Sequence, residues 1–262
     1  MYYPGGTSLW RNTDTESNPS SGWTELSDAA PSGYVITSVR ASISSSEHVL
    51  YYGAVDADGD NTAEPARLFR VDNASSIPAS NFTRNELPSS GATTFPDGGY
   101  VSDIAVDPQD SDRVMVAISN YEVTSLFYSA DGGQSWTDVE GNLGGSTGPS
   151  VRSVEILPQP ALGQTTYYAA TSVGLYSTTS LSSTATWTQE GGGSIGNVVV
   201  EDVEARNEDG FVLAGTHGNG VYSSTVTVPV ELARFEVARQ GSDVELSWAT
   251  ASETNNAGFR VE

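Results

Sequence analysis

The sequence of 262 residues contains no cysteine and no lysine. Without cysteine the chain can form neither a disulfide bond nor a thiolate metal site. All 11 basic residues are arginines, and they face 33 Asp and Glu residues, which gives a formal net charge of -22. A surface this acidic repels phosphate groups, so we expect neither nucleic acid nor an anionic membrane as a partner.

The same composition suggests two kinds of source. High acidity without lysine is typical of proteins from halophilic organisms, in which salt screens the repulsion between carboxylates. An acidic secreted protein of an ordinary organism is the alternative, and the composition does not separate the two. No apolar run is long enough for membrane insertion, and the residues after Met1 do not form a signal peptide. We expect a signal peptide in a part of the protein upstream of Met1.

The sequence also lacks any sustained apolar period of 3.6 residues, so long amphipathic helices are not expected. Val, Thr, Ser, Tyr and Gly dominate, and short runs alternate between apolar and polar residues. Hydrophobic residues make up 37% of the chain, enough for a substantial core. These features predict an all-β protein.

A four-strand pattern repeats at intervals of about 45–60 residues. An aromatic residue followed by threonine and a polar residue recurs at Trp23, Phe82, Trp136 and Trp187. An apolar–aromatic pair precedes each copy at Leu9, Leu68, Leu126 and Leu175, and a fifth pair begins at Val221. Two further strands complete the unit, the first at 36–43, 101–108, 151–158 and 200–207, and the second at 48–55, 113–119, 165–171 and 210–216.

Such a repeat predicts the blades of a β-propeller, each of which must stack on its neighbours to bury both faces. Three blades are complete in the sequence. The first blade lacks its first strand, and the last lacks a fourth strand. The predicted fold is therefore a partial β-propeller of about four to five four-stranded blades over residues 1–226, which we interpret as a fragment of a larger ring.

One turn carries a specific resemblance. Residues 129–136, SADGGQSW, match the Asp-box pattern Ser-x-Asp-x-Gly-x-Ser/Thr-Trp. The chain thus resembles Asp-box (BNR repeat) β-propellers, such as sialidases, sortilin-like receptors and xyloglucan-cleaving glycoside hydrolases, in which the box links the third and fourth strands of a blade. Turn geometry explains the composition without a ligand, because the aspartate accepts backbone hydrogen bonds and the glycines permit positive φ. The expected structural residues are Ser129, Asp131, Gly133, Ser135 and Trp136.

A second resemblance begins after Pro229. The stretch SWATASETNNAGFRVE at the end of the chain is similar to the fibronectin type III-like module that precedes type IX secretion sorting signals in Bacteroidota. Residues 227–262 would then form an incomplete β-sandwich, with strands near 231–239, 243–250 and 257–262. The resemblance implies an exported protein, extracellular or at the cell surface, that meets the type IX secretion machinery through a missing C-terminus.

An acidic loop is the one candidate for a metal site. Asp56, Asp58 and Asp60 alternate in a way that can converge carboxylates on calcium. The helix–loop–helix calcium pattern fails, because Asn61 stands at its glycine position and Arg67 at its glutamate position. A solvated acidic loop is the alternative, and we expect no other cofactor.

Candidate ligand-binding residues lie where the first strands of the blades begin, on the expected rim of the central channel. They are Ser102, Asp103, Arg152, Glu201 and Asp202, with His217 in a glycine-rich loop of the last blade. A glycosidase needs two carboxylates facing each other, and a sialidase needs a cluster of arginines, but no catalytic residue can be assigned from these positions. The sequence favours a binding or scaffolding surface for polysaccharide or protein. The alternative is a fragment of a secreted xyloglucanase-like or sialidase-like glycoside hydrolase whose catalytic residues are mostly elsewhere.

Overall fold

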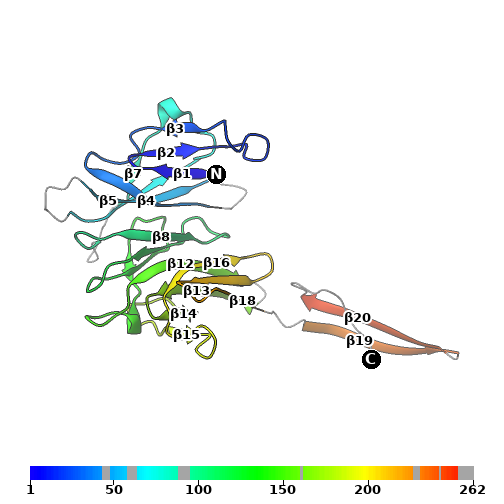
Figure 1. The fold of residues 1–262 in the computed structure, drawn as a ribbon. Coiled ribbons are helices and arrows are strands. Elements are labelled where there is room, and N and C mark those ends of the chain that lie inside the picture. Colours follow the sequence, from blue (N-terminus) through cyan, green and yellow to red (C-terminus); the bar gives the residue numbers. More distant parts are fainter. Residues whose placement is uncertain are drawn as a thin grey trace.

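The computed structural model describes residues 1–42, 48–57, 64–87, 95–159, 162–226, 231–241 and 243–252. Nearly all of these residues lie in antiparallel strands and turns, with two short 3₁₀ helices, η1 (Ala79–Asn81) and η2 (Gly141–Leu143). The all-β prediction is confirmed (Figure 1). Within the described ranges, no helix has the length and apolar character needed to cross a membrane.

Five sheets follow one another along the first 226 residues. Sheet I holds β1 (Tyr2–Gly5), β2 (Ser8–Arg11) and β3 (Thr24–Leu26), and sheet II holds β4 (Tyr34–Ala41), β5 (Leu50–Asp56), β6 (Arg67–Val71) and β7 (Asn85–Glu86). Sheet III holds β8 (Val101–Val106), β9 (Val114–Ile118), β10 (Leu126–Ser129) and β11 (Thr137–Asp138). Sheet IV holds β12 (Val151–Gln159), β13 (Gln164–Thr171), β14 (Gly174–Thr178) and β15 (Thr188–Glu190), and sheet V holds β16 (Val200–Arg206), β17 (Phe211–Thr216) and β18 (Val221–Thr225).

Every sheet pairs its strands in chain order, as the blades of a propeller do. Sheets II, III and IV are the three complete four-stranded blades that the repeat predicts. Sheet I begins at the second strand of the pattern, and sheet V ends at the third within the described residues. The partial-propeller prediction is thereby confirmed in its blade order and strand number.

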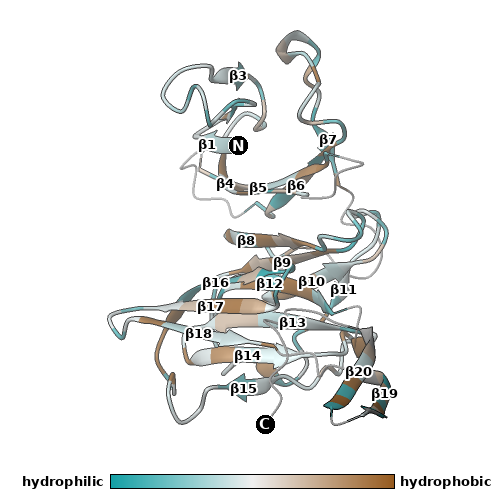
Figure 2. Cartoon of the chain, turned by 90° about the vertical axis from the view of Figure 1, so that its right-hand side faces the viewer, coloured by the Kyte–Doolittle hydropathy of each residue, from teal (hydrophilic) through white to brown (hydrophobic). Residues whose placement is uncertain are grey.

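The hydrophobic core lies between the sheets rather than inside any one of them. Four clusters of buried apolar side chains join successive sheets, and strongly apolar strand segments occur in both central and terminal sheets, for example β8 and β17 (Figure 2). Their buried members include Leu9 and Phe69 between I and II, Tyr51 and Phe127 between II and III, Met115 and Trp187 between III and IV, and Tyr168 and Val203 between IV and V. Each sheet is buried only by its neighbours, which is the physical reason for the repeat.

The fourth strand of sheet II differs from the expected register. Trp23, Trp136 and Trp187 each stand immediately before a fourth strand, as the aromatic–threonine pattern predicts. Phe82 does not, because it follows η1 and the strand β7 begins three residues later, at Asn85. Phe82 still packs against the cluster between sheets I and II. The aromatic contact is therefore kept while the register of the strand shifts.

A two-stranded hairpin, β19 (Glu231–Gln240) and β20 (Asp243–Ser252), follows sheet V and projects away from the other sheets (Figure 1). Phe235 pairs with Trp248 across the hairpin. Polar and apolar bands alternate along both strands (Figure 2). Phe235 is 55% exposed and Val237 61%, so one apolar face of the hairpin is open. The third expected strand, near 257–262, lies outside the described residues, and the boundary between residues 226 and 227 stays a prediction.

Candidate functional site

The innermost strand of each complete sheet and of sheet V carries a register shift at the same place. The shifts fall at Thr37, Ser102, Arg152 and Glu201. A β-bulge of this kind turns its extra side chain away from the regular alternation. Here two of these side chains bind the next sheet, because Thr37 Oγ1 donates to the Val101 carbonyl at 2.7 Å and Ser102 Oγ to the Val151 carbonyl at 3.3 Å. The bulges therefore tie neighbouring inner strands together.

One residue beyond each bulge, a polar cluster joins three of the inner strands. Ser153 Oγ on β12 lies 2.7 Å from Asp103 Oδ2 on β8 and 3.1 Å from Asp202 Oδ1 on β16. The backbone N–H of Val154 also donates to Asp103 Oδ2, and the N–H of Ile104 to Asp103 Oδ1. Asp103 and Asp202, two of the predicted ligand-binding residues, thus lie on either side of one serine hydroxyl.

Two residues further along, an arginine from sheet II crosses to sheets IV and V. Arg40 Nη2 on β4 contacts Glu155 Oε2 on β12 at 2.5 Å, and Nη1 contacts Glu204 Oε1 on β16 at 2.8 Å. Ala105 occupies the matching position on β8 and is fully buried. The Glu155 side chain is only 4% exposed, whereas that of Glu204 is 54% exposed.

Burial dominates the titration of this cluster. It raises the pKa of Asp103 to about 6, against the three hydrogen bonds and the charge of Arg40, which lower it. Burial likewise raises the pKa of Glu155 above its ordinary value, and Arg40 acts in the opposite direction. The cluster is an ion-paired, hydrogen-bonded junction between inner strands, with one carboxyl group that protonates in the weakly acidic range.

The remaining predicted rim residues form a separate group. Arg152 Nη1 lies 3.3 Å from Glu201 Oε2, and His217 Nδ1 lies 3.2 Å from Glu201 Oε1. The His217 side chain is 77% exposed. The structure thus divides the six predicted residues into Asp103 with Asp202, Arg152 with Glu201 and His217, and Ser102, which bonds backbone carbonyls. Arg40, Glu155 and Glu204 were not predicted, although they occupy equivalent positions in the repeat, two residues after Ser38, Ser153 and Asp202 respectively.

The predicted calcium loop is not testable as a whole. Asp56 ends strand β5, but Asp58 and Asp60 lie outside the described residues. Among the residues with described placement, no group of three or more His, Asp or Glu side chains is arranged to hold a metal ion. The calcium site stays a prediction.

The turn 129–136 is held by its own side chains. Asp131 Oδ1 accepts the backbone N–H of Ser135 at 2.9 Å, and Oδ2 accepts the Ser135 hydroxyl at 2.6 Å. Ser129 Oγ donates to Asp131 Oδ1 and accepts the N–H of Gly133 at 2.8 Å. Gly133 has φ of +88°, and a Cβ there would lie 2.6 Å from Leu87 of the preceding sheet. Trp136 is then buried against that sheet, in contact with Phe95.

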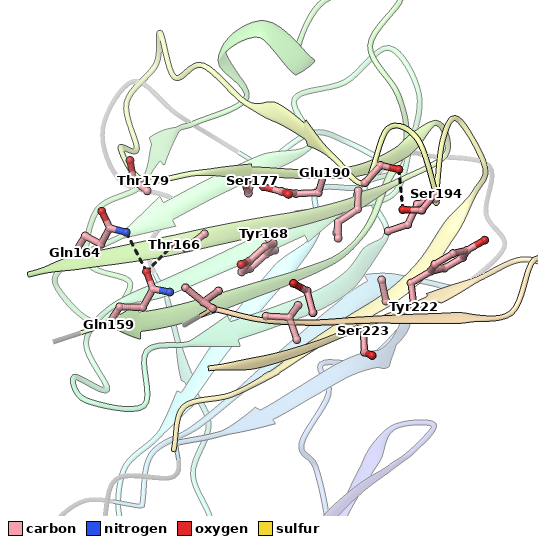
Figure 3. A pocket seen from close by; sticks show the side chains of 17 residues that line it. Gln159, Gln164, Thr166, Tyr168, Ser177, Thr179, Glu190, Ser194, Tyr222 and Ser223 are labelled. Atoms are coloured by element: carbon pink, nitrogen blue, oxygen red, sulfur yellow. Dashed lines mark hydrogen bonds between the residues drawn. The ribbon is translucent and has the colours of Figure 1, made fainter. Parts of the chain in front are cut away.

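A cleft lies elsewhere, between sheets IV and V, and has a volume of about 500 Å³ (Figure 3). Tyr168 on β13 and Leu175 on β14 form one wall, and Val212 on β17 with Tyr222 on β18 forms the other. Glu190, at the end of β15, also lines it and accepts the Ser177 hydroxyl at 2.5 Å. The cleft thus combines aromatic and apolar walls with polar groups, as ligand sites usually do.

A buried amide at one end of this cleft has an unsatisfied donor. Gln159 is 5% exposed, and its Oε1 accepts hydrogen bonds from Gln164 Nε2 at 3.1 Å and Thr166 Oγ1 at 3.0 Å (Figure 3). Its Nε2 has no hydrogen-bond partner among the residues that the structure describes. An unpaired buried N–H group of this kind costs about 1–3 kcal/mol. The sequence offered no direct signal for this group.

Glu190 is the one signal in the sequence that could have located the cleft. The strand registers place it in the same column as Leu26, Leu87 and Val139. In the three earlier sheets this column is apolar and buried. A carboxylate at a repeat position that is otherwise apolar and buried indicates that this surface of sheet IV is not covered in the way that the earlier sheets are.

No protein-family model and no curated protein matches the chain. Three solved structures are similar to it at low identity: the GH74 enzyme of Niastella koreensis (15% identity, TM-score 0.42), Raptor of Chaetomium thermophilum (13%, 0.46) and the major Malassezia sympodialis allergen Mala s 1 (11%, 0.47). Each similarity covers 94–95% of this chain, and it covers 41%, 19% and 83% of the respective other chain. The chain thus spans less than half the length of the first two. Similarities at these scores carry no argument about function.

Proposed function

We propose that the chain is a binding or scaffolding module of an exported or cell-surface protein, and that it recognises a polysaccharide or a protein. The cleft between sheets IV and V carries this proposal. It is lined by two tyrosines and a carboxylate, and the unpaired amide of Gln159 lies buried at one end of it. Aromatic and polar side chains of this kind are common in sites that bind a ligand but catalyse no reaction.

The inner-strand carboxylates favour binding over catalysis for a different reason. Asp103 already accepts three hydrogen bonds, and Glu155 is paired with Arg40. A general acid or base must be able to reach a substrate proton, and these groups are engaged with the protein itself. Their arrangement supports a role in holding the inner strands together.

One observation favours the second candidate, a fragment of a glycoside hydrolase. Asp103 and Asp202 lie on either side of the Ser153 hydroxyl, and the raised pKa of Asp103 is the kind that a general acid needs. The variant Asp202→Asn separates the candidates, because Asp202 is exposed and its loss leaves the buried part of the cluster in place.

The test incubates the protein with xyloglucan and related glucans. We expect no sustained release of reducing sugar. Release that Asp202→Asn abolishes would overturn the binding module in favour of the hydrolase. Retention of the chain on an immobilised glucan or on a protein ligand, with no release, supports the module.

Export is proposed on the resemblance of the last 36 residues to modules that precede type IX sorting signals. Fractionation of the native cells tests it, since the protein is expected in the medium or at the cell surface. Recovery in the cytoplasm alone would contradict it.

A further inference from the structure

The cleft between sheets IV and V is the counterpart of sites that are filled between the earlier sheets. In the strand registers, Tyr168 and Leu175 of sheet IV match Met115 and Leu126 of sheet III, and Glu190 matches Val139. Trp187 packs against the sheet III set, in the cluster between sheets III and IV. The cleft therefore has the position at which a fourth-strand tryptophan of sheet V would pack.

The equivalent positions between the earlier sheets are filled by tryptophan side chains. The Trp187 side chain is buried, and its Nε1 donates to the Val139 carbonyl at 2.9 Å. Asn142 in η2 also holds the backbone of Trp187, through its Nδ2 to the Trp187 carbonyl at 3.0 Å. Trp136 is likewise buried against sheet II, although its Nε1 has no hydrogen-bond partner among the residues that the structure describes. Both tryptophans are followed by threonine at the start of a fourth strand.

The edge of sheet V beside the cleft can accept a strand. Thr216 N–H donates to the Gly220 carbonyl, and Val226 N–H donates to the Gly210 carbonyl. Because hydrogen-bonded pairs alternate along an antiparallel ladder, Tyr222 and Ser224 use their N–H and C=O groups toward β17. Those of Val221, Ser223 and Thr225 face away from β17. Within the described part of the chain, sheet V has no fourth strand to pair with them.

Val221 and Ser223 match the residues that bind the fourth strand in sheet III. Ser223 corresponds to Tyr128, which is paired with Thr137 in β11. An incoming strand in the same register places its threonine opposite Ser223 and its preceding aromatic residue over the cleft. The column of Tyr222 is aromatic in every sheet, with Trp10, Phe69, Phe127 and Tyr176 as its other members.

We propose that the cleft and the β18 edge together bind an extended polypeptide segment containing an aromatic residue followed by threonine, which adds to sheet V as a fourth strand. This inference rests on the proposed binding function and names its ligand. A polypeptide fits better than a polysaccharide, because only a peptide backbone can pair with the outward N–H and C=O groups of β18. The aromatic side chain buries the walls of the cleft, and the backbone sets the register.

The experiment uses a synthetic peptide, TATWTQEG, that copies residues 184–191 around β15, the fourth strand of sheet IV. The peptide is titrated into the protein by calorimetry. We expect saturable binding with one site. The same peptide with its tryptophan replaced by alanine is expected to bind at least about tenfold more weakly, since it loses the buried aromatic contact. This control cannot disturb the folding of the protein. Equal binding of the two peptides, or binding of neither, would overturn the proposal.

A pair of edge variants tests the backbone pairing. Ser223→Pro removes an outward N–H group, whereas Ser223→Ala keeps it and changes only an exposed side chain. We expect Ser223→Pro to abolish peptide binding and Ser223→Ala to preserve it, with circular dichroism confirming that both are folded. Unchanged binding to a folded Ser223→Pro variant would overturn the proposal.

Two further outcomes assign the site to another ligand. Binding of a soluble glucan together with no binding of either peptide would leave the binding module standing and overturn the strand ligand. A dimer in sedimentation that Ser223→Pro dissociates would assign the edge to a second copy of the chain instead.

Discussion

Arg40 on β4 forms an ion pair with Glu155 on β12, and the two side chains meet at 2.5 Å. The contact joins sheet II to sheet IV, although sheet III lies between them in the chain. Arg40 also contacts Glu204 on β16 at 2.8 Å. The arginine therefore links the inner strands of sheets II, IV and V.

Loss of this arginine leaves a buried carboxylate without a cation. Arg40→Met should destabilise the protein by an amount near the lower end of about 3–5 kcal/mol, because Arg40 is 28% exposed and part of the charge is screened by solvent. The double variant Arg40→Met/Glu155→Met removes both charges and should recover most of the loss. Urea unfolding of the three proteins measures both effects. A double variant no more stable than Arg40→Met would contradict a buried-charge cost.

Asp103 makes stability depend on pH in the weakly acidic range. Its folded pKa of about 6 lies above the ordinary value of 3.8, so the folded state binds the proton more tightly than the unfolded state. This contribution to stability is full below pH 4 and is lost as the pH rises through 6. Between pH 7 and pH 5 the protein should gain about 1 kcal/mol from this group.

The variant Asp103→Asn isolates that contribution, because asparagine does not titrate while Glu155 and the other carboxyl groups remain. Urea midpoints at pH 7 and pH 5 give the comparison. The gain at pH 5 should be smaller in the variant than in the unchanged protein by about 1 kcal/mol. Equal gains in the two proteins would show that Asp103 titrates with an ordinary pKa.

The strands were predictable from the sequence because each blade repeats the same alternation. Four inner strands, their partners and three of the four fourth strands lie where the pattern places them. Phe82 failed as a register marker, since η1 changes the path of the chain before β7 while leaving the aromatic contact in place. Periodicity reports which face is buried, but it does not fix where a short edge strand begins.

The site was less predictable for a related reason. Asp103, Arg152 and Glu201 were identified as inner-strand residues, but the sequence does not say which of them meet. The partners depend on how the inner strands stack and on the small shift that each bulge adds. The cleft forms because sheet V has no fourth strand beside β18 among the described residues. The sequence pattern alone does not show which side chains then line the open surface.

Asp131 should act on stability and not on ligand binding. Burial acts to raise its pKa, but the hydrogen bonds from Ser135, Ser129 and Gln134 outweigh it, so the pKa lies below its ordinary value. Asp131→Ala removes the acceptors of the Ser135 N–H and hydroxyl and should cost about 1–3 kcal/mol. Ser135→Ala, which loses only the hydroxyl bond, should cost less. Loss of ligand binding with unchanged melting would contradict a structural role.

The acidic composition predicts a strong response to salt. A net charge of -22 destabilises the compact state through self-repulsion, which salt screens over a Debye length of about 3 Å at 1 M. The melting temperature should therefore rise between 0.1 M and 1 M NaCl. Choline chloride at the same ionic strength is the control, since screening does not depend on which cation supplies it. A flat or falling melting temperature in both salts would contradict net repulsion as a main cost of folding.

Gly141 in η2 is the glycine whose replacement should disturb the contact between sheets III and IV most. Its φ is +51°, and a Cβ there would lie 1.8 Å from the Ala185 carbonyl oxygen of sheet IV. Gly145 is the matched control, because its φ is +95° and a Cβ there meets nothing within 4 Å. Both alanine variants bear the cost of a left-handed backbone, about 1 kcal/mol or more, but only Gly141→Ala must also move the backbone that precedes Trp187.

Gly141→Ala should therefore melt well below Gly145→Ala and show a red-shifted tryptophan emission. Equal melting of the two variants would mean that the sheets separate at this point without cost, which the buried Trp187 and its bonds to Val139 and Asn142 argue against.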